Sequence, residues 1–449
     1  MIKSKKSSEI YESGKKFILI PALIFTGLEG MAQEADTLNN DRFSIHAQTT
    51  VITQYKPAFR AKYTGQNSLV PREEAQRSIT ATLFLGAKLW KGASIFMNPE
   101  IGGGSGLSGS LGVGASTNGE TYRVSTPSPA FELARLFFRQ IISLNNETAF
   151  YESDLNRLGG RMPTEFFSII IGKICMSDFF DNNKYSHEPR TQFMSWALMS
   201  NGAWDYPANT RGYTPSVIFE LITPRHELRY GFSLVSTTPN GMIMNWAINK
   251  AGSHTLEYTH NYTFSGRKGA FRFLTFFTTA NMGNYNQSIA ISPESPDIKT
   301  TEKYGHTKYG FGLNCEQEIT KDLGVFLRAG WNDGKNETWE FTEIDRSVSC
   351  GLSLTGERWN RKNDNIGLAC VVSGLSAPHR NYLKAGGLGF ELGDGNLNYA
   401  PENLLEFYYS MELIKNINVS GAYQFIGNPG YNKDRGPVNI FSIRVHIEI

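Results

Sequence analysis

The sequence lacks long apolar runs, a strong net charge and a dense cysteine pattern. Beyond residue 32, no run of about 18 or more apolar residues occurs, so membrane-spanning helices are not expected. The formal net charge is only +2, which argues against a nucleic-acid or other polyanionic partner. The 4 cysteines among 449 residues have no regular spacing, so a disulfide scaffold is also excluded.

What the sequence does have is alternation of apolar and polar residues, and its last segment shows this most clearly. In residues 441–449, apolar residues occupy one phase and Ser442, Arg444, His446 and Glu448 occupy the other. Because successive side chains of a strand point to opposite faces, such a strand has one apolar and one hydrophilic face. A strand of about nine residues can cross a bilayer at a tilt, with its polar face toward a wet lumen.

The same alternation recurs along the chain and predicts an all-β, antiparallel transmembrane barrel of sixteen strands. Long connections follow odd strands and short ones follow even strands, as expected for long extracellular loops and short periplasmic turns. The link 144–165 is the one exception, because it is long where a short turn is expected. A further candidate strand at 385–392 would reverse the parity, so it is assigned to the seventh long loop. The predicted strands cover residues 43–55, 77–90, 93–101, 131–143, 166–174, 215–222, 227–235, 253–264, 270–280, 307–319, 323–332, 345–355, 365–373, 403–413, 417–426 and 438–449.

The N-terminus has the features of a secretory signal. Lys15 and Lys16 precede an apolar run at 17–28, and small residues precede a cleavage point near Ala32/Gln33. We therefore expect export to the outer membrane of a Gram-negative cell. The expected division is a signal peptide at 1–32, a short periplasmic segment at 33–42 and a barrel domain at 43–449.

The strand at 131–143 supplies the first candidate pore residues. Its apolar phase holds Ala134, Leu136 and Phe138, and its lumen phase holds Arg135, Phe137 and Arg139. Two guanidinium groups beside an aromatic ring suit a neutral sugar, since rings stack on C–H faces and fixed donors meet hydroxyls. Alternatively, these arginines pair with loop carboxylates and only set the field of the pore. The residues alone leave both hypotheses open.

Two long loops supply the remaining candidates. The glycine-rich segment 102–130 contains Glu120, Tyr122 and Arg123 and could fold inward to constrict the pore. The third loop contains Asp178 and Asp181, followed by a set of aromatic residues. This mixture is typical of a sugar-contacting surface, but loops and aromatic girdles also use such residues for structure. The aromatic residues are Trp196, Trp204, Tyr206 and Tyr213.

Several ordered stretches from about residue 78 to the end resemble the carbohydrate-selective porin family, the OprB-type porins. They include Ala134-Arg135-Leu136-Phe137-Phe138-Arg139-Gln140, Asp178-Phe179-Phe180-Asp181 and Asn398-Tyr399-Ala400-Pro401-Glu402. The resemblance implies passive diffusion of monosaccharides through a sixteen-stranded barrel narrowed by inward-folded loops. It also implies that Arg135 and Arg139 belong to the pore. The chain departs from the family at Ile449, where such barrels usually end in an aromatic residue read by the assembly machinery.

The expected partners are transported sugars, outer-membrane lipid and the barrel-assembly machinery, with a homotrimer and a monomer both left open. A general diffusion porin for small hydrophilic solutes and ions is the alternative function, and lumen arginines fully paired with carboxylates would favour it. Cys350 and Cys370 are expected to face each other across a hairpin, as two lipid-facing thiols or as a bonded pair.

Enzymatic and metal-binding patterns are weak. Of eight histidines, only His260 falls on an apolar strand phase, and no partner serine accompanies it, so a barrel lipase or acyl-transfer enzyme is not expected. Asp178, Asp181 and Asp394 could bind calcium, but lone loop carboxylates are usually solvated. We therefore predict no enzyme activity, no cofactor and no metal site.

Overall fold

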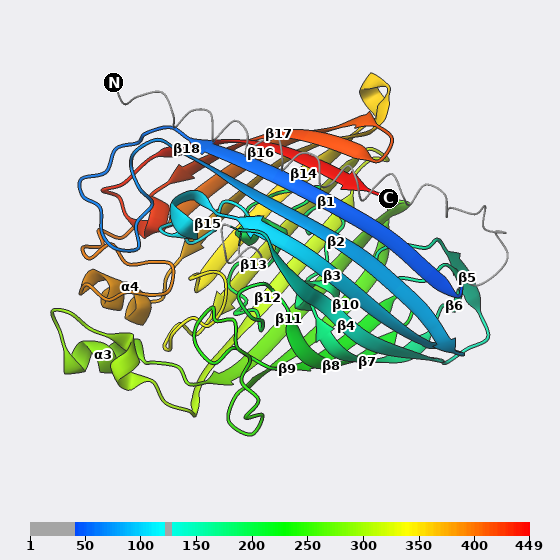
Figure 1. Ribbon diagram of the computed structural model, residues 1–449, viewed down its shortest axis with the longest axis horizontal. Coiled ribbons are helices and arrows are strands. Elements are labelled where there is room, and N and C mark those ends of the chain that lie inside the picture. Colours follow the sequence, from blue (N-terminus) through cyan, green and yellow to red (C-terminus); the bar gives the residue numbers. More distant parts are fainter. Residues whose placement is uncertain (1–40, 122–127) are drawn as a thin grey trace, which may run out of the picture.

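A computed structural model describes residues 41–121 and 128–449 of the chain (Figure 1). Within these residues, sixteen antiparallel strands close into one barrel, and two further short strands form a separate sheet. The barrel strands are β1 (Phe43–Lys56), β2 (Glu74–Trp90), β3 (Ala93–Gly104), β4 (Ala130–Ser143), β7 (Phe166–Ile174), β8 (Thr214–Ile222), β9 (His226–Ser233), β10 (Gly252–Phe264), β11 (Arg267–Ala280), β12 (His306–Glu318), β13 (Leu323–Asn332), β14 (Arg346–Gly356), β15 (Arg361–Gly374), β16 (Glu402–Ile414), β17 (Ile417–Gly427) and β18 (Val438–Glu448).

The barrel is inverted relative to a soluble protein, with apolar side chains outside and polar ones inside. In β18, Phe441 and Ile443 are 50% and 61% exposed, whereas the alternating Arg444 and His446 are almost fully buried. An exposed apolar band of this kind is stable only against lipid, and the buried polar phase needs partners inside the lumen. The alternation in the sequence is therefore the direct cause of the two faces of the wall.

The first and last strands complete the barrel. They pair antiparallel over eight residue pairs, from Gln48 opposite Glu448 to Tyr55 opposite Phe441. Backbone bonds Ala47 N–H to Ile449 O at 2.8 Å and Ile449 N–H to Ala47 O at 2.9 Å extend this closure. Because every strand has two neighbours, no sheet edge is left unpaired in the wall, as the apolar interior of a membrane requires.

All sixteen predicted strands are confirmed, with ends that differ by a few residues, and residues 385–392 lie in a loop as predicted. The exceptional link 144–165 contains a hairpin, β5 (Thr148–Tyr151) and β6 (Gly160–Pro163), paired as a sheet of its own. One detail was wrong: Ala134 is fully buried rather than lipid-facing, because the pairing register between β3 and β4 shifts at Asn98/Pro99.

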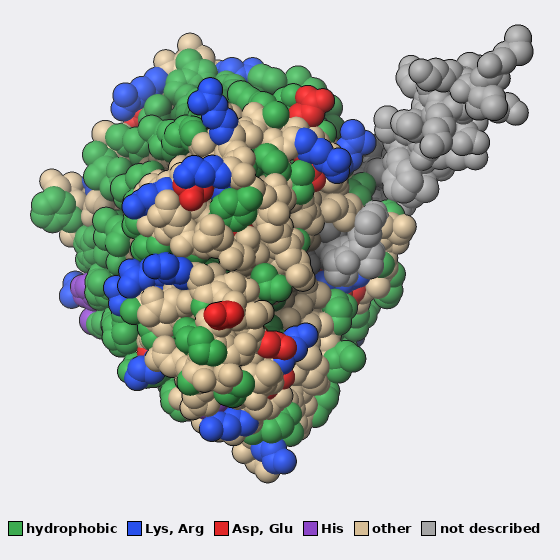
Figure 2. Space-filling view, turned by 90° about the vertical axis from the view of Figure 1, so that its left-hand side faces the viewer, with side chains coloured by type: hydrophobic (Ala, Val, Ile, Leu, Met, Phe, Trp, Pro, Cys, Tyr) green, Lys and Arg blue, Asp and Glu red, His purple; other side chains and the backbone are tan. Residues whose placement is uncertain are grey.

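The two ends of the barrel differ. We call the end with the long connections the loop end and the opposite end, where β5 and β6 lie, the turn end (Figure 1). The helices are α2 (Trp196–Met199), α3 (Tyr285–Ile291) and α4 (Ala377–Lys384), and α3 and α4 project at the loop end. Seen from the loop end, Lys and Arg side chains are scattered over a largely polar face, and hydrophobic side chains gather toward its edge (Figure 2).

The lumen is largely filled by parts of the second and third long connections, here called loop 2 (residues 105–121 and 128–129) and loop 3 (residues 175–213). Buried residues of loop 3, including Trp196, Trp204 and Tyr206, form a hydrophobic cluster with wall residues such as Phe137. Among residues 41–121 and 128–449, no helix is both long and apolar enough to cross a membrane.

Cys350 and Cys370 are directly paired across β14 and β15, as predicted from their spacing. Both thiols are free and exposed on the outer face of the wall. This arrangement matches the prediction of two lipid-facing thiols.

Candidate functional site

Arg328 anchors the beginning of loop 3 to the wall. Its Nε donates to Asp181 Oδ1 at 3.2 Å, and its two terminal nitrogens donate to carbonyls of loop 3, including Leu198 O at 2.9 Å. Asp181 also accepts from the backbone N–H of Asn201 at 2.7 Å. One guanidinium group with five donors can thus fix two separate turns of a loop against one strand.

Two charged residues of β16 and β18 hold the middle of loop 3. Arg444 on β18 donates to the carbonyls of Pro189, Thr191 and Gln192 at 2.6–2.9 Å. Glu406 on β16 accepts the backbone N–H groups of Met194 and Ser195 at 2.6 and 2.9 Å. These side chains satisfy loop backbone groups that would otherwise be buried without partners.

Arg190, in the middle of loop 3, forms a buried ion cluster with two acids from different elements. Its Nε lies 3.0 Å from Glu120 Oε2 on loop 2, and its Nη2 lies 3.1 Å from Glu100 Oε2 on β3. All three side chains are at most 3% exposed. Because a buried charge is stable only when paired, Arg190 ties loops 2 and 3 and the wall into one unit.

Loop 2 is held inside the barrel, so of the two alternatives, an inward-folded loop and a flexible surface loop, the first holds for its described residues. Glu402 on β16 accepts the N–H groups of Gly114 and Ala115 at 3.1 and 2.8 Å. The carbonyl of Thr117 accepts from Gln54 on β1 and Gln424 on β17, at 3.2 and 2.9 Å. Loop 2 therefore lines the β1–β3 and β16–β18 side of the lumen and closes it.

The other side of the lumen has a chain of alternating charges along its wall. Glu220 on β8 accepts from Arg139 on β4 at 3.0 Å and from Arg229 on β9 at 2.9 Å. Arg229 also lies 2.7 Å from Glu227 and 3.9 Å from Glu257. Arginine and glutamate thus alternate around the barrel from β4 to β10, and each charge is partly neutralised by the next.

A second charged group lies toward the loop end of β4. Arg135 makes a bidentate pair with Asp178, with bonds of 2.6 and 2.7 Å, and stacks 5.3 Å above the ring of Tyr213. Lys173 lies 5.7 Å from the same ring and 2.5 Å from Glu132. Bidentate carboxylate pairing fixes the plane of a guanidinium group, so Arg135 is held rigidly.

Several side chains of the two charged groups on and near β4 are more exposed than the ion cluster around Arg190. The Asp178, Lys173 and Arg139 side chains are 28%, 27% and 20% exposed, whereas Arg190 and Glu100 are 3% and 1% exposed. Water therefore reaches some charged side chains of β4, β7 and the start of loop 3 but not the ion cluster around Arg190. Between them, wall residues such as Ile170 and Ile218 are buried against the hydrophobic centre of loop 3.

The predicted site residues that the structure describes separate into three groups. Arg135 and Arg139 lie on β4, where Arg135 is buried against Asp178 and where Arg139 is partly exposed. Phe137 is buried and stacks on Phe96 with ring centroids 5.1 Å apart, so it supports the wall. Glu120 and Asp181 are buried and hold loops in place. Tyr122 and Arg123 lie outside the described residues. Contact of any of these side chains with a solute stays a prediction.

The aromatic residues of loop 3 are structural, so the hypothesis that they form a sugar-contacting surface was wrong. Trp196, Trp204 and Tyr206 are at most 2% exposed. Trp196 stacks on Phe341 at 4.3 Å, and Trp204 packs edge-on against Tyr206 at 5.0 Å. Aromatic pairs of this geometry stabilise a core. They give loop 3 a hydrophobic centre of its own inside a polar lumen.

Sequence reasoning missed several residues of the charged wall and of the loop anchors. Glu220 and Arg229 could have been found, because they are equidistant from the turn 223–226 and therefore face each other across one hairpin. Arg190 carries no comparable local signal. Its partners, Glu100 and Glu120, are distant in sequence and meet it only when two loops fold inward.

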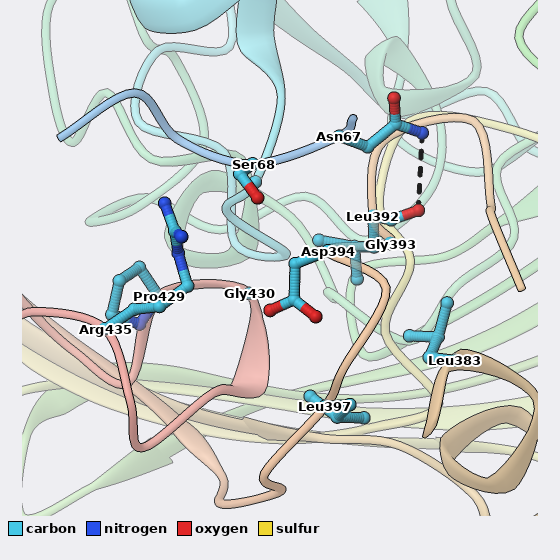
Figure 3. Close-up of a pocket in the computed structure, with 11 residues that line it drawn as sticks. Asn67, Ser68, Leu383, Leu392, Gly393, Asp394, Leu397, Pro429, Gly430 and Arg435 are labelled. Carbon is cyan, nitrogen blue, oxygen red and sulfur yellow. Dashed lines mark hydrogen bonds between the residues drawn. The ribbon is translucent and has the colours of Figure 1, made fainter. Parts of the chain in front are cut away.

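The long connections also contact one another at the loop end. Residues of four connections enclose a small pocket of about 10 Å³, enough for about one water molecule (Figure 3). Asp394 projects into this pocket and accepts from Asn432 at 2.5 Å, while Asn67 donates to Leu392 O at 3.3 Å. Asp394 therefore helps to join loops, and it lies far in sequence from Asp178 and Asp181, which pair with arginines.

A buried charged cluster fixes α4 at the loop end. His379 Nδ1 lies 3.0 Å from Asp345 Oδ2, and its Nε2 lies 3.7 Å from Glu343 Oε1. Burial alone lowers the pKa of His379, but the charge of Asp345 and hydrogen bonds to both acids raise it to about 8. The ring also stacks on Tyr285 of α3 at 4.4 Å. Protonated His379 thus links α3, α4 and the segment before β14.

Comparison with known proteins gives one family match and several structural ones. The profile described as "Carbohydrate-selective porin, OprB family" matches residues 66–449. No curated protein shows significant sequence similarity to the chain.

Among solved structures, the high-pH structure of Pseudomonas putida OprB is similar with a TM-score of 0.69 and 14% identity, covering 91% of this chain and 94% of that one. The outer membrane channel DcaP of Acinetobacter baumannii gives a TM-score of 0.47 at 9% identity, covering 93% of this chain and 99% of that one. OmpT of Vibrio cholerae gives 0.45 at 12% identity, covering 92% of this chain and all of that one. The first likeness supports the fold.

Proposed function

Since the chain belongs to the carbohydrate-selective porin family, OprB type, we propose that it lets small sugars diffuse passively across the outer membrane. Monosaccharides and related small carbohydrates are the transported solutes. The observation that carries this is the lumen itself, where loops 2 and 3 fold inward and partly accessible charged side chains such as Asp178, Lys173 and Arg139 remain. A fixed wall of donors and acceptors suits solutes rich in hydroxyl groups.

A general diffusion porin is the second candidate, and one observation favours it. Arg135 is paired with Asp178 and Arg139 with Glu220, so neither guanidinium group is an isolated charge. Pairing with a carboxylate lowers the electric field that each arginine adds to the pore, but it keeps the N–H groups of the arginine in a fixed orientation. Both functions predict passage of small sugars, and they differ in whether the chain discriminates sugars from other solutes of the same size.

Liposome swelling with a set of sugars tests the proposal. Vesicles containing the wild type should swell faster in glucose than in an amino acid of similar size, and Arg135→Ala and Arg139→Ala should weaken this preference. Equal rates for sugars and amino acids in the wild type would support the general porin. Wild-type preference in both variants would show that these arginines do not contact the sugar.

Export and processing follow the signal-like N-terminus. The expected order is cleavage near Ala32/Gln33, a short segment to residue 42 and then the barrel, inserted into lipid by the barrel-assembly machinery. Mass spectrometry of the protein from purified outer membranes measures the cleavage point directly. A protein in the outer membrane that still carries residues 1–32 would contradict the expected cleavage.

A homotrimer and a monomer are the two alternatives for the assembly state. Native mass spectrometry in detergent distinguishes the two masses. Enzymatic activity is not part of the proposed function, because the family consists of channels.

A further inference from the structure

The hairpin in the link 144–165 reaches into the turn end of the barrel. Its base is closed by the bond from Leu144 N–H to Glu165 O at 2.9 Å. Near its tip, Asn156 Oδ1 accepts from Asn98 on β3 at 2.9 Å, and Ser153 Oγ lies 2.9 Å from His46 Nε2 on β1. These side chains of β1 and β3 face the lumen, so the tip lies inside the barrel mouth and not beside it.

A cavity of about 440 Å³ separates this hairpin from the wall at β2–β4. Its volume lies in the usual range of small-molecule sites, roughly 300–1,000 Å³. Trp90, which is 58% exposed, supplies aromatic surface, and Asn145, Asn146 and Asn156 supply amide groups. Aromatic faces with nearby amides are suited to a sugar ring, because one surface meets C–H groups and the other meets hydroxyls.

The charge of the cavity is strongly one-sided. Its lining includes Lys88, Lys91, Arg139, Arg157 and Arg161, against the single carboxylate of Asp41. Arg139 is balanced by Glu220 and Arg157 by Asp154. Across the residues that the structure describes, no carboxylate lies within ion-pair distance of Lys88 or Lys91. Two ammonium groups therefore give the cavity a positive potential.

The cavity is connected to the charged wall through Arg139. The same side chain lines the cavity and bonds to Glu220 on β8, at the end of the alternating charges. Arg139 therefore adjoins both the cavity and the alternating charges of the wall. The hairpin forms the other side of this cavity at the turn end.

We propose that this turn-end cavity binds anionic monosaccharides, sugars of hexose size that carry a carboxylate. Lys88 and Lys91 bind the carboxylate, and Trp90 with the hairpin amides contacts the ring. This deepens the proposed function, on which it rests, by adding sugar acids to the neutral sugars. The carboxylate gains hydrogen bonds to charged donors that a neutral sugar of the same shape lacks.

Isothermal titration calorimetry of the full-length protein in detergent, with glucuronate and with glucose, measures this preference. Wild type should bind glucuronate about tenfold more tightly than glucose, a difference set by the charge-assisted bonds. Lys88→Gln with Lys91→Gln should lose the preference. Lys321→Gln with Lys415→Gln is the matched control, since both lysines are exposed on other turns and do not line the cavity. The control should keep the preference.

Three results would each contradict a different part of the proposal. Equal affinity for glucuronate in the wild type and the Lys88/Lys91 double variant would overturn the inference, while glucose entry in swelling assays would leave the porin function standing. Acetate binding as tightly as glucuronate would show a general anion site and overturn the sugar part. If neither glucose nor glucuronate enters vesicles, the proposed function itself fails.

Discussion

At the scale of single residues, the charged side chains of the lumen have two different tasks. Arg190, Arg328 and Arg444 are at most 3% exposed and bond to loop carbonyls or acids, so they fix loops. Arg139 and Arg229 are 20% and 16% exposed and are partly accessible to water. Burial, and not residue type, decides which arginine holds structure and which meets water.

Replacing Arg190 by Met should destabilise the inward fold of loops 2 and 3. The change leaves Glu100 and Glu120 buried without their common partner, which costs about 3–5 kcal/mol in comparable buried pairs. We expect a lower free energy of unfolding in denaturant titrations, and a larger and noisier single-channel conductance as loop 3 loosens. Arg190→Lys, which keeps a charge, should lie between wild type and Arg190→Met. Wild-type conductance and stability in Arg190→Met would contradict the role of this cluster.

The order of α4 should depend on pH through His379. The folded-state pKa is about 8, above the usual value near 6.5. The protonated form is therefore stabilised by folding, fully below pH 6.5, and the contribution of about 2 kcal/mol is lost as pH rises through 8. Burial raises the pKa of Glu337 to about 8, so this carboxyl also binds more protons in the folded than in the unfolded state. Its contribution to stability therefore also falls as the pH rises.

Hydrogen exchange of residues 377–384 measures this effect, with rates corrected for intrinsic pH dependence. Protection should be higher at pH 6 than at pH 9, and Asp345→Asn should reduce the difference. Equal protection at both pH values in the wild type would show that the His379 cluster does not hold α4.

At the scale of elements, the strands could be predicted from the sequence and the loops could not. Alternation fixes which face of a strand meets lipid, so β18 and the pairing of Cys350 with Cys370 followed from local pattern alone. Loop 3 folds inward because of contacts such as Arg444 to Pro189 O, between residues more than 250 positions apart. No periodicity reports such contacts, and for this reason the sequence left open whether the aromatic residues of loop 3 form a sugar-contacting surface or serve the structure.

The hairpin formed by β5 and β6 should be removable without loss of the barrel. It pairs only with itself as a sheet, and Leu144 and Glu165 at its base are already hydrogen-bonded. Replacement of residues 145–164 by Asn-Gly, a favoured two-residue turn, should give a folded barrel with higher conductance, because the turn end is no longer narrowed. Conductance in planar bilayers and heat-modifiable gel mobility measure channel and fold. Unchanged conductance would place the hairpin outside the path of ions.

At the scale of the whole molecule, the chain is an outer-membrane barrel whose interior is built by its own loops. The closed wall removes sheet edges and exposes apolar residues to lipid, while loops 2 and 3 fold into the lumen. The wall from β4 to β10 carries alternating arginine and glutamate, and its arginines are partly accessible to water. Passive sugar transport along this wall is the central claim.

The most direct test is the ion conductance of the purified protein in planar bilayers during addition of sugar. Glucose that enters the narrow charged path should displace ions, so potassium chloride conductance should fall with increasing glucose and saturate, while an amino acid of similar size leaves it unchanged. Conductance that does not respond to glucose, or that responds equally to the amino acid, would contradict sugar selectivity.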